Sequence, residues 1–484
     1  MLRLKKQVYN PYLPNYEYIP DGEPHIFGDR VYVYGSHDRF DGNKFCLLDY
    51  VCYSAPVDDL SDWRYEGVIF SKKNDPHRMD GEGRMAAPDC VQGKDGRFYF
   101  YYFGSATMQH MSVAVCDSPA GKFEYLGDVR YQDGTPIGKA GDPCVFDPGV
   151  FIDDDGKIYL YHSFAMTTNP FVSKGRKMTI NGPVCFELED DMLTVKKGPT
   201  YIGVAPRNSF ATMYEGHEFL EASSMRKFDG KYYFIYSSQL SHELCYAVSD
   251  YPDRDFSYGG TLISNGDIGL YGYDTRHAAN FTGNTHGSLI KIKDKFYVFY
   301  HRQTNRNQYS RQACAEEIVF HNGKFYQAEM TSCGLNGGPL EGDGTYSTSI
   351  ACNLRSRFGS RFYIAFKLFQ WVEPCLTQSG TDREENPDQY IQNMCNGAMA
   401  GFKYFDLSKT KNISVFVKGK AKGILEVRDK YDQYAEPIAT IPIEVQNSPS
   451  NFKAKFTGPL KSKSGLYFTF RGTGHFDFYS FTLI

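Results

Sequence analysis

The chain has 484 residues and carries a net charge of -4 at pH 7, with a pI near 6.3. This length allows one large core beside a smaller one, or two to three average domains. The lack of a basic excess argues against nucleic-acid binding, and the 16% aromatic content, mostly Tyr and Phe, favours strands and an aromatic surface for a ligand.

The first residues, 1–7, are charged and are not followed by the apolar run that a signal peptide needs. No segment approaches the length of a membrane span, so we expect a soluble, cytoplasmic protein. The 12 cysteines are scattered and include no CxxC pair, and several lie in apolar, strand-like runs. We therefore expect reduced, buried thiols.

A polar turn followed by an aromatic, alternating strand recurs along the first two thirds of the chain. A turn with Asp or Gly ahead of a strand-forming run is a hairpin signal. The five copies span residues 28–34, 95–101, 155–161, 229–234 and 293–299.

A second pattern follows the first in several copies: a short apolar strand leads to a further strand that contains an aromatic residue. It is found at residues 51–67, 113–127 and 246–259. Each unit of roughly sixty to seventy residues thus carries about four strands, as a propeller blade does. Unrelated sandwiches could contain the same turns, but the constant order of the two patterns favours a five-bladed β-propeller.

The repeats stop near residues 337–340, and a stretch containing Gly and Ser follows through residue 347. Further strands and turns alternate without the blade pattern, at residues 362–366, 413–417, 423–427, 438–443 and 465–470. We therefore predict an all-β chain, with a five-bladed propeller over residues 1–335 and a jelly-roll-like β-sandwich over residues 345–484.

Three acids, Asp21, Asp147 and Glu221, precede an aromatic turn by similar intervals. Alone, each is more often a turn-forming or capping residue than a catalyst. Their common offset places them at similar depth around the axis of a propeller. Two carboxylates that converge on a cavity can divide acid and base roles when their pKa values differ, as glycoside hydrolysis requires.

Residues 21–32, 147–161, 221–236 and 284–288 together resemble glycoside hydrolase family 43, over roughly residues 8 to 330. The resemblance implies a five-bladed β-propeller that removes arabinofuranose or xylose from plant polysaccharides with inversion. It also implies that Asp21 is the general base that activates water and that Glu221 is the general acid. Asp147 would tune the pKa of the acid and hold it in place.

Two features depart from the family pattern. Gly22 follows Asp21 where the family commonly has proline. Glu215 and Glu218 compete with Glu221 for the acid role. We prefer Glu221 because its distance to the turn at residues 229–231 fits the pattern.

The resemblance also places His286 near the axis, where it would contact a calcium ion held largely by water. A buried core histidine is the alternative. No organic cofactor is implied.

The segment containing Ala87 and Asp89 resembles the one that lines the sugar subsite, although an Asp after Pro is as often a turn residue. Arg276, Arg302 and Arg311 flank the last blade. One of them, Arg302 in our prediction, would hold sugar hydroxyls, while stacking on tyrosine is the structural alternative.

The C-terminal part resembles a family 6 carbohydrate-binding module, and a purely structural sandwich is the alternative. We predict an inverting exo-acting hydrolase that releases terminal α-L-arabinofuranose or β-D-xylose from oligosaccharides, without nucleic-acid or membrane partners. The alternatives are a non-catalytic sugar-binding propeller and a retaining fructan or sucrose hydrolase of related architecture.

Overall fold

A computed structural model describes residues 6–79, 81, 83–104, 109–139, 141–165, 181–204, 209–363, 372–384, 388–432 and 434–484. Within these residues the regular elements are strands, apart from three short 3-10 helices, η1 (Lys72–Asn74), η2 (Gly334–Asn336) and η3 (Thr348–Ile350). In the same residues, no helix is long and apolar enough to cross a membrane. The chain is all-β, as predicted.

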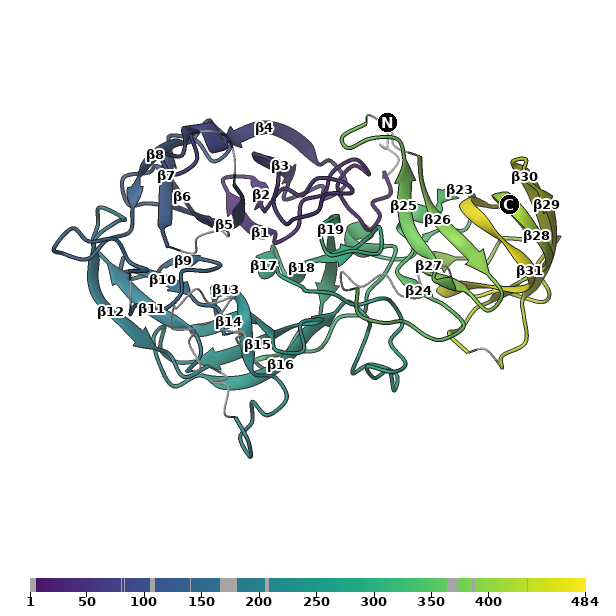
Figure 1. The fold of residues 1–484 in the computed structure, drawn as a ribbon. Coiled ribbons are helices and arrows are strands. Elements are labelled where there is room, and N and C mark those ends of the chain that lie inside the picture. The colour runs from purple at the N-terminus through teal and green to yellow at the C-terminus, as the bar shows by residue number, and fades with distance from the viewer. Residues whose placement is uncertain are drawn as a thin grey trace.

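Five antiparallel sheets surround a common axis and form the predicted five-bladed β-propeller (Figure 1). In every sheet the strands pair in chain order. The first two blades are β1 (Glu23–Phe27), β2 (Arg30–Tyr34), β3 (Tyr50–Pro56) and β4 (Arg64–Phe70), then β5 (Met85–Gln92), β6 (Phe98–Gly104), β7 (Met111–Cys116) and β8 (Glu124–Asp128). The next two are β9 (Gly149–Ile152), β10 (Ile158–His162), β11 (Val184–Leu188) and β12 (Val195–Tyr201), then β13 (Phe219–Phe228), β14 (Lys231–Ser238), β15 (Glu243–Ser249) and β16 (Ser257–Ser264). The fifth is β17 (Ser288–Ile292), β18 (Lys295–Gln303) and β19 (Arg311–Ile318).

The first strand of each blade lines the axis. These strands contact one another in a closed ring: β1 touches β5 and β17, β9 touches β5 and β13, and β13 touches β17. The repeated aromatic pattern is the turn into the second strand of each blade together with that strand, which is buried between neighbouring blades. Residues at the start of a first strand therefore face the axial cavity.

The fifth blade has three strands, fewer than the four predicted for each unit. The N-terminal segment runs along its outer strand instead of adding a fourth. The side-chain amide of Asn10 donates to the carbonyl oxygen of Ala315 at 3.0 Å and accepts the Ala315 N–H at 3.0 Å. The side-chain amide of Asn10 thus makes hydrogen bonds to β19 that a fourth strand would otherwise make. After β19 the chain forms a small hairpin, β20 (Phe320–His321) and β21 (Lys324–Phe325).

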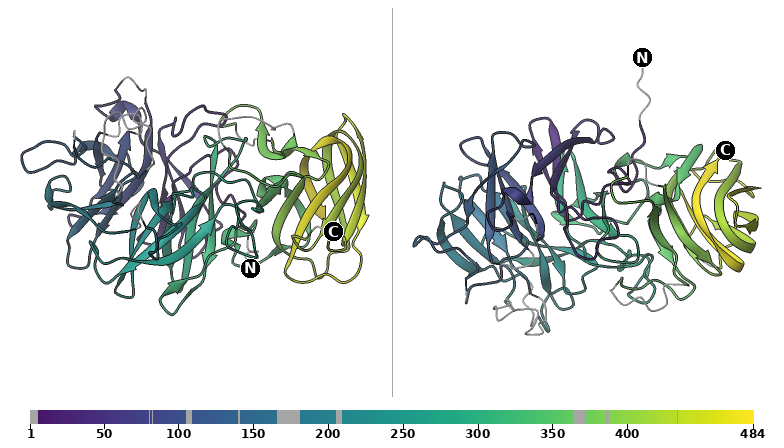
Figure 2. Two further views of the ribbon diagram at one scale, coloured as in Figure 1. Left: turned by 60° about the horizontal axis from the view of Figure 1, so that its bottom comes forward. Right: turned by 45° about the horizontal axis from the view of Figure 1, so that its top comes forward.

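The C-terminal strands pack around a second hydrophobic core beside the propeller (Figure 2). They pair into one ten-stranded network in which two long strands, β28 (Asn412–Arg428) and β31 (Ser464–Leu483), run antiparallel along most of their lengths. This arrangement is consistent with a β-sandwich. The other strands are β22 (Leu340–Glu341), β23 (Gly344–Ser347), β24 (Asn353–Arg355), β25 (Cys375–Ser379), β26 (Asp388–Cys395), β27 (Met399–Asp406), β29 (Ala439–Gln446) and β30 (Ser450–Lys455).

Ionic contacts join the two parts of the chain. The ammonium group of Lys403, on β27, lies 2.9 Å from Asp267 and 2.8 Å from Glu329, which both belong to the propeller side. Arg383 contacts Glu17 at 2.9 Å. Because breaking a buried ion pair leaves an uncompensated charge, the pair of Lys403 with Asp267 holds the second core against the propeller.

Candidate active site

One cavity of about 440 Å³ opens at the axis, and residues of all five blades line it. It contains the three predicted acids, Asp21, Asp147 and Glu221. The other lining residues include Phe45, Cys46, Arg84, Ala86, Phe146, Phe164, Ser241, Asn284, His286, Gln308 and Arg311, together with Phe362 from the C-terminal part of the chain.

The backbone around each acid aims its side chain into this cavity. Asp21 and Asp147 each lie two residues before the first strand of a blade, with φ angles of 59° and 45°. Non-glycine residues seldom adopt positive φ, and where they do the strain is often tied to function. Glu221 is the third residue of β13, between two register shifts of its pairing with β14. Such bulges redirect a side chain that regular alternation would place elsewhere.

Asp21 is buried in a positively charged environment. Its carboxylate accepts a hydrogen bond from Arg311 at 2.8 Å. Burial on its own raises the pKa of Asp21, but the charges of Arg311 and then of His286 lower it overall. Asp21 is therefore ionised in the neutral range.

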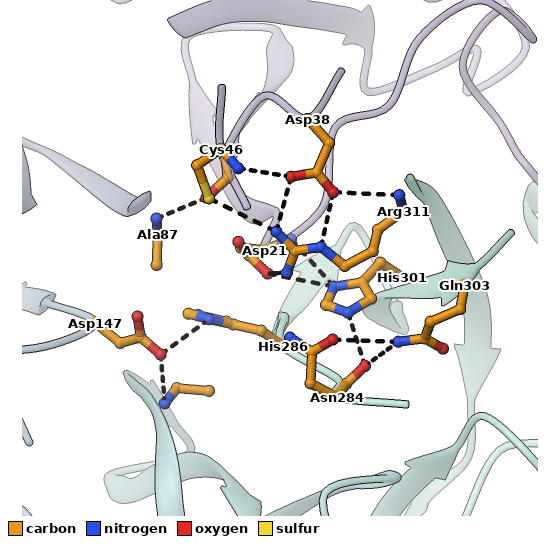
Figure 3. A network of polar contacts seen from close by, with 12 residues as sticks. Asp21, Asp38, Cys46, Ala87, Asp147, Asn284, His286, His301, Gln303 and Arg311 are labelled. Atoms are coloured by element: carbon orange, nitrogen blue, oxygen red, sulfur yellow. Dashed lines mark hydrogen bonds and ion pairs between the residues drawn. The ribbon is translucent and has the colours of Figure 1, made fainter. Parts of the chain in front are cut away.

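Arg311 connects Asp21 with a second buried acid, Asp38 (Figure 3). Its guanidinium group donates to the two oxygens of Asp38 at 2.8 Å and 3.1 Å. Burial raises the pKa of Asp38 despite this contact. The planar, multiply donating guanidinium can hold two carboxylates in fixed positions, which lysine cannot do.

A neutral histidine, His301, accepts a hydrogen bond from the backbone of Asp21. The Nδ1 atom of His301 accepts the backbone N–H of Asp21 at 3.3 Å, and its Nε2 donates to the carbonyl oxygen of Asn284 at 2.8 Å. Burial, followed by the charge of Arg311, lowers the pKa of His301 to about 3. The ring therefore stays neutral and fixes the backbone on which Asp21 sits.

Asp147 is coupled to the strand that carries Glu221. Its carboxylate accepts the N–H of Ala222 at 3.0 Å and lies 3.4 Å from Nδ1 of His286. Burial raises the pKa of Asp147 although His286 acts in the opposite direction. Asp147 thus touches the residue that follows Glu221 in the chain.

Glu221 has the pKa that a proton donor needs. Burial, and then the negative charge of Asp147, raise its pKa to about 8. At neutral pH its carboxyl group is therefore mainly protonated, while Asp21 is ionised. One cavity thus holds a carboxylic acid and a carboxylate whose pKa values are displaced in opposite directions.

The neighbourhood of His286 fits a hydrated cation. Glu23, on β1, is buried, and its Oε2 accepts hydrogen bonds from Ser224 at 3.0 Å and from Arg226 at 2.7 Å. Its Oε1 has no hydrogen-bond partner among the described residues, and it lies 3.9 Å from Nε2 of His286. Because calcium takes oxygen ligands, Oε1 of Glu23 is the protein atom here that suits the ion, and His286 would contact only a water of its hydration shell.

Two of the predicted sugar contacts, Asp89 and Arg302, lie away from the cavity. The carboxylate of Asp89 is fully buried, at 2.6 Å from His25 and 2.8 Å from the N–H of Val150. Arg302 is also buried, and its guanidinium donates to the carbonyl oxygens of Ser349 and Ala351. Both side chains are therefore committed to internal contacts away from the cavity.

Ala87, the third predicted sugar contact, is buried and is not a lining residue. Its N–H donates to Ser36 at 2.7 Å, while its neighbour Ala86 reaches the cavity wall. Of the three arginines that the sequence suggested, Arg311 is the one at the cavity.

Several residues of the site were given no role in the sequence analysis. Asn284 lies in the recognised segment 284–288, but only His286 of that segment was singled out. Asp38 and His301 act only through partners distant in sequence. Phe362 comes from the other part of the chain, so no propeller repeat could have indicated it.

A five-bladed propeller with acids from three blades around one axial cavity defines a glycosidase-type site. The model of the glycosyl hydrolases family 43 matches residues 25–325. The chain belongs to glycoside hydrolase family 43, and it is therefore a glycoside hydrolase.

Similar proteins extend this likeness beyond the propeller. A xylosidase/arabinosidase of Thermoclostridium stercorarium is 46% identical over 486 residues, which cover 99% of both chains. The solved structure of a family 43 arabinoxylan arabinofuranohydrolase from Bacillus subtilis, in complex with cellotetraose, is 19% identical. It covers 97% of this chain and 96% of that chain with a TM-score of 0.50, so the fold is shared over both parts.

A third similar protein is a β-xylosidase/α-arabinofuranosidase from a compost microbial metagenome, solved in complex with xylotriose in a calcium-free form. It is 25% identical and covers 64% of this chain and 94% of that chain, with a TM-score of 0.50.

Proposed function

We propose that this glycoside hydrolase releases terminal α-L-arabinofuranose, β-D-xylose or both from plant-derived oligosaccharides, with inversion. The names of the similar proteins, a xylosidase/arabinosidase and an arabinoxylan arabinofuranohydrolase, support the pentose substrates. Exo action is supported by the cavity, because walls from all five blades and Phe362 suit a chain end better than a long polymer.

The observation that carries the proposal is the opposite displacement of the pKa values of Asp21 and Glu221 within one cavity. Glu221 donates its proton to the glycosidic oxygen as the bond to the leaving group breaks. Asp21 removes a proton from a water molecule, which attacks the anomeric carbon from the opposite face. Asp147 keeps the acid protonated by repulsion and fixes its backbone through Ala222.

We further propose a calcium ion between Glu23 and His286, held largely by water. Oε1 of Glu23 accepts no hydrogen bond among the described residues and lies 3.9 Å from Nε2 of His286, which supports this position. Bound there, the ion would supply positive charge beside the acidic groups of the cavity. The protein groups Glu23 and His286 would hold its hydration shell.

The decisive experiment follows the anomeric configuration of the first sugar released. Purified protein is incubated with xylotriose and with arabinofuranosyl-substituted xylotriose, and proton NMR records the anomer before mutarotation. We expect a pentose of inverted configuration from the chain end. Release of the retained anomer would contradict the proposal and favour a carboxylate nucleophile. Sugar binding without turnover, unchanged in Asp21→Asn/Glu221→Gln, would identify a non-catalytic propeller.

A further inference from the structure

A second cleft differs from the axial cavity in its lining residues and in its position. It has a volume of about 360 Å³ and shares no lining residue with the axial cavity. One wall is the connector between β16 and β17, and the other comes from β24, β27, β28 and β31 and their loops. Its residues include Tyr271, Tyr273, His277, Arg355, Arg357, Met399, Arg428, Lys430, Tyr431, Asp432, Tyr434, Tyr467, Thr469 and Arg471. Clefts of this size between two packed units are common ligand sites.

Some tyrosine rings of this cleft pack against one another, and others are exposed to solvent. Tyr431 packs edge-on against Tyr273 and Tyr467, with ring centroids 4.9 Å and 5.8 Å apart. By contrast, Tyr271 is 74% exposed and Tyr434 is 87% exposed. Aromatic side chains that extend into solvent from the rim of a cleft offer flat apolar faces to a ligand.

The cleft also carries an excess of positive charge. Five of its lining residues are Arg or Lys, and Asp432 is the one carboxylate among the residues that line it. Arg428 and Arg471 share Glu426, at 3.0 Å and 3.4 Å.

Three of the five cations have no such partner. Among the described residues, Arg355, Arg357 and Lys430 form no ion pair, although Arg355 donates to the hydroxyl of Tyr431 at 2.7 Å. Arg357 lies instead over the ring of Phe358, at 4.5 Å from its centroid. Arginine groups that are not neutralised within the protein suit the planar, bidentate recognition of a carboxylate.

We propose that this cleft binds a carboxylate-bearing carbohydrate, namely a uronosyl unit attached to an oligosaccharide. The exposed tyrosines pack against the C–H faces of its sugar rings, and Arg357 and Lys430 pair with its carboxylate. A neutral sugar would use the tyrosines alone and leave the excess positive charge without a partner. The cleft thus recognises a substituent that the axial cavity does not hydrolyse, and it tethers branched chains to the enzyme.

Binding is tested on full-length Glu221→Gln protein, so that hydrolysis does not consume the ligand. Calorimetry compares xylotriose that carries a glucuronosyl branch with xylotetraose, a neutral chain with the same number of sugars. We expect the acidic ligand to bind at least tenfold more tightly and its advantage to shrink as salt is raised. Equal affinities would overturn the proposal.

Substitutions inside and outside the cleft test whether the acidic ligand binds there. Arg357→Gln/Lys430→Gln should abolish the advantage of the acidic ligand, whereas Lys122→Gln/Lys324→Gln, at exposed positions outside the cleft, should preserve it. Tyr434→Ala should weaken both ligands, and Tyr326→Ala, at another exposed tyrosine, should weaken neither.

Two further results would overturn the proposal: an advantage that survives Arg357→Gln/Lys430→Gln, or complete displacement of the acidic ligand by an equal concentration of inorganic phosphate. In the background with Glu221 intact, Arg357→Gln/Lys430→Gln should keep its activity on aryl xylosides. This result separates failure of the cleft from failure of the proposed reaction.

Discussion

The carboxylate of Asp147 accepts the backbone N–H of Ala222 at 3.0 Å, directly after Glu221 in the chain. This hydrogen bond connects blade three with β13 of blade four, the strand that carries the proposed acid, Glu221. The same carboxylate is the second-largest cause, after burial, of the raised pKa of Glu221. The side chain of Asp147 therefore influences both the position and the pKa of Glu221.

Replacement of Asp147 by Asn should shift the alkaline limb of the pH profile to lower pH. The amide oxygen of Asn can still accept the Ala222 N–H, but the charge that raises the pKa of Glu221 is lost. In the unmodified enzyme, kcat/KM should fall as pH rises through about 8, because Glu221 loses its proton there. The check is kcat/KM against pH for both proteins. Asp155→Asn, on an exposed turn, is the control, and coincident alkaline limbs for all three would contradict the role of Asp147.

Glu221→Gln should lower kcat on xylobiose by about 10²- to 10⁴-fold, the usual contribution of a general acid. An aryl pentoside with a good leaving group needs little protonation, so its hydrolysis should fall much less. Steady-state kinetics on both substrates measure the difference. Glu215→Gln, at the exposed competitor six residues earlier, should retain activity on both. Similar losses of Glu221→Gln on both substrates would count against its acid role.

In this chain, features that depend on local sequence could be predicted, whereas contacts between residues distant in sequence could not. The blades and the three acids could be predicted because turn, strand and acid repeat at local spacings. The buried position of Asp89 could not be predicted, because its partners, His25 and Val150, come from other blades. Along β18, His301 faces Asp21, so the adjacent Arg302 faces the other side, towards Ser349. That alternation becomes informative only when the position of the C-terminal part is known.

Arg311→Lys and Arg302→Lys should have separable effects. Lysine at 311 cannot hold Asp21 and Asp38 together, so kcat/KM should fall by about 10- to 100-fold, the loss of one charged hydrogen bond. The pKa of Asp21 should rise towards its ordinary value, which moves the acid limb of the profile to higher pH.

Lysine at 302 removes contacts with Ser349 and Ala351 that join the two parts of the chain. It should lower the thermal midpoint while leaving KM and the acid limb unchanged. The measurements are pH profiles and thermal melting curves of both variants. A raised KM in Arg302→Lys would instead support the original prediction that this residue holds sugar hydroxyls.

Removal of the Phe362 ring should weaken the binding of oligosaccharides. Phe362 lines the axial cavity from outside the propeller, so it can contact sugars beyond the terminal unit. Phe362→Ala should raise KM for xylotriose by about tenfold, the usual value of a lost apolar contact, and should change KM for an aryl xyloside less. Phe358→Ala, at an exposed position on the preceding turn, is the matched control. Equal effects of the two variants would show that the C-terminal part is not in contact with substrate.

Calcium should stabilise the enzyme through Glu23. When Oε1 of Glu23, which accepts no hydrogen bond among the described residues, gains an ion that binds only the folded chain, the thermal midpoint rises with calcium concentration. Chelator-treated protein should therefore melt at a lower temperature than protein with added calcium, and magnesium should not substitute for calcium fully. In Glu23→Gln the carboxylate charge is lost, so the calcium-dependent shift should disappear. In Glu66→Gln, on the outer strand β4, the shift should remain. If Glu23→Gln keeps the full shift, the ion binds elsewhere and the assignment to the axis is wrong.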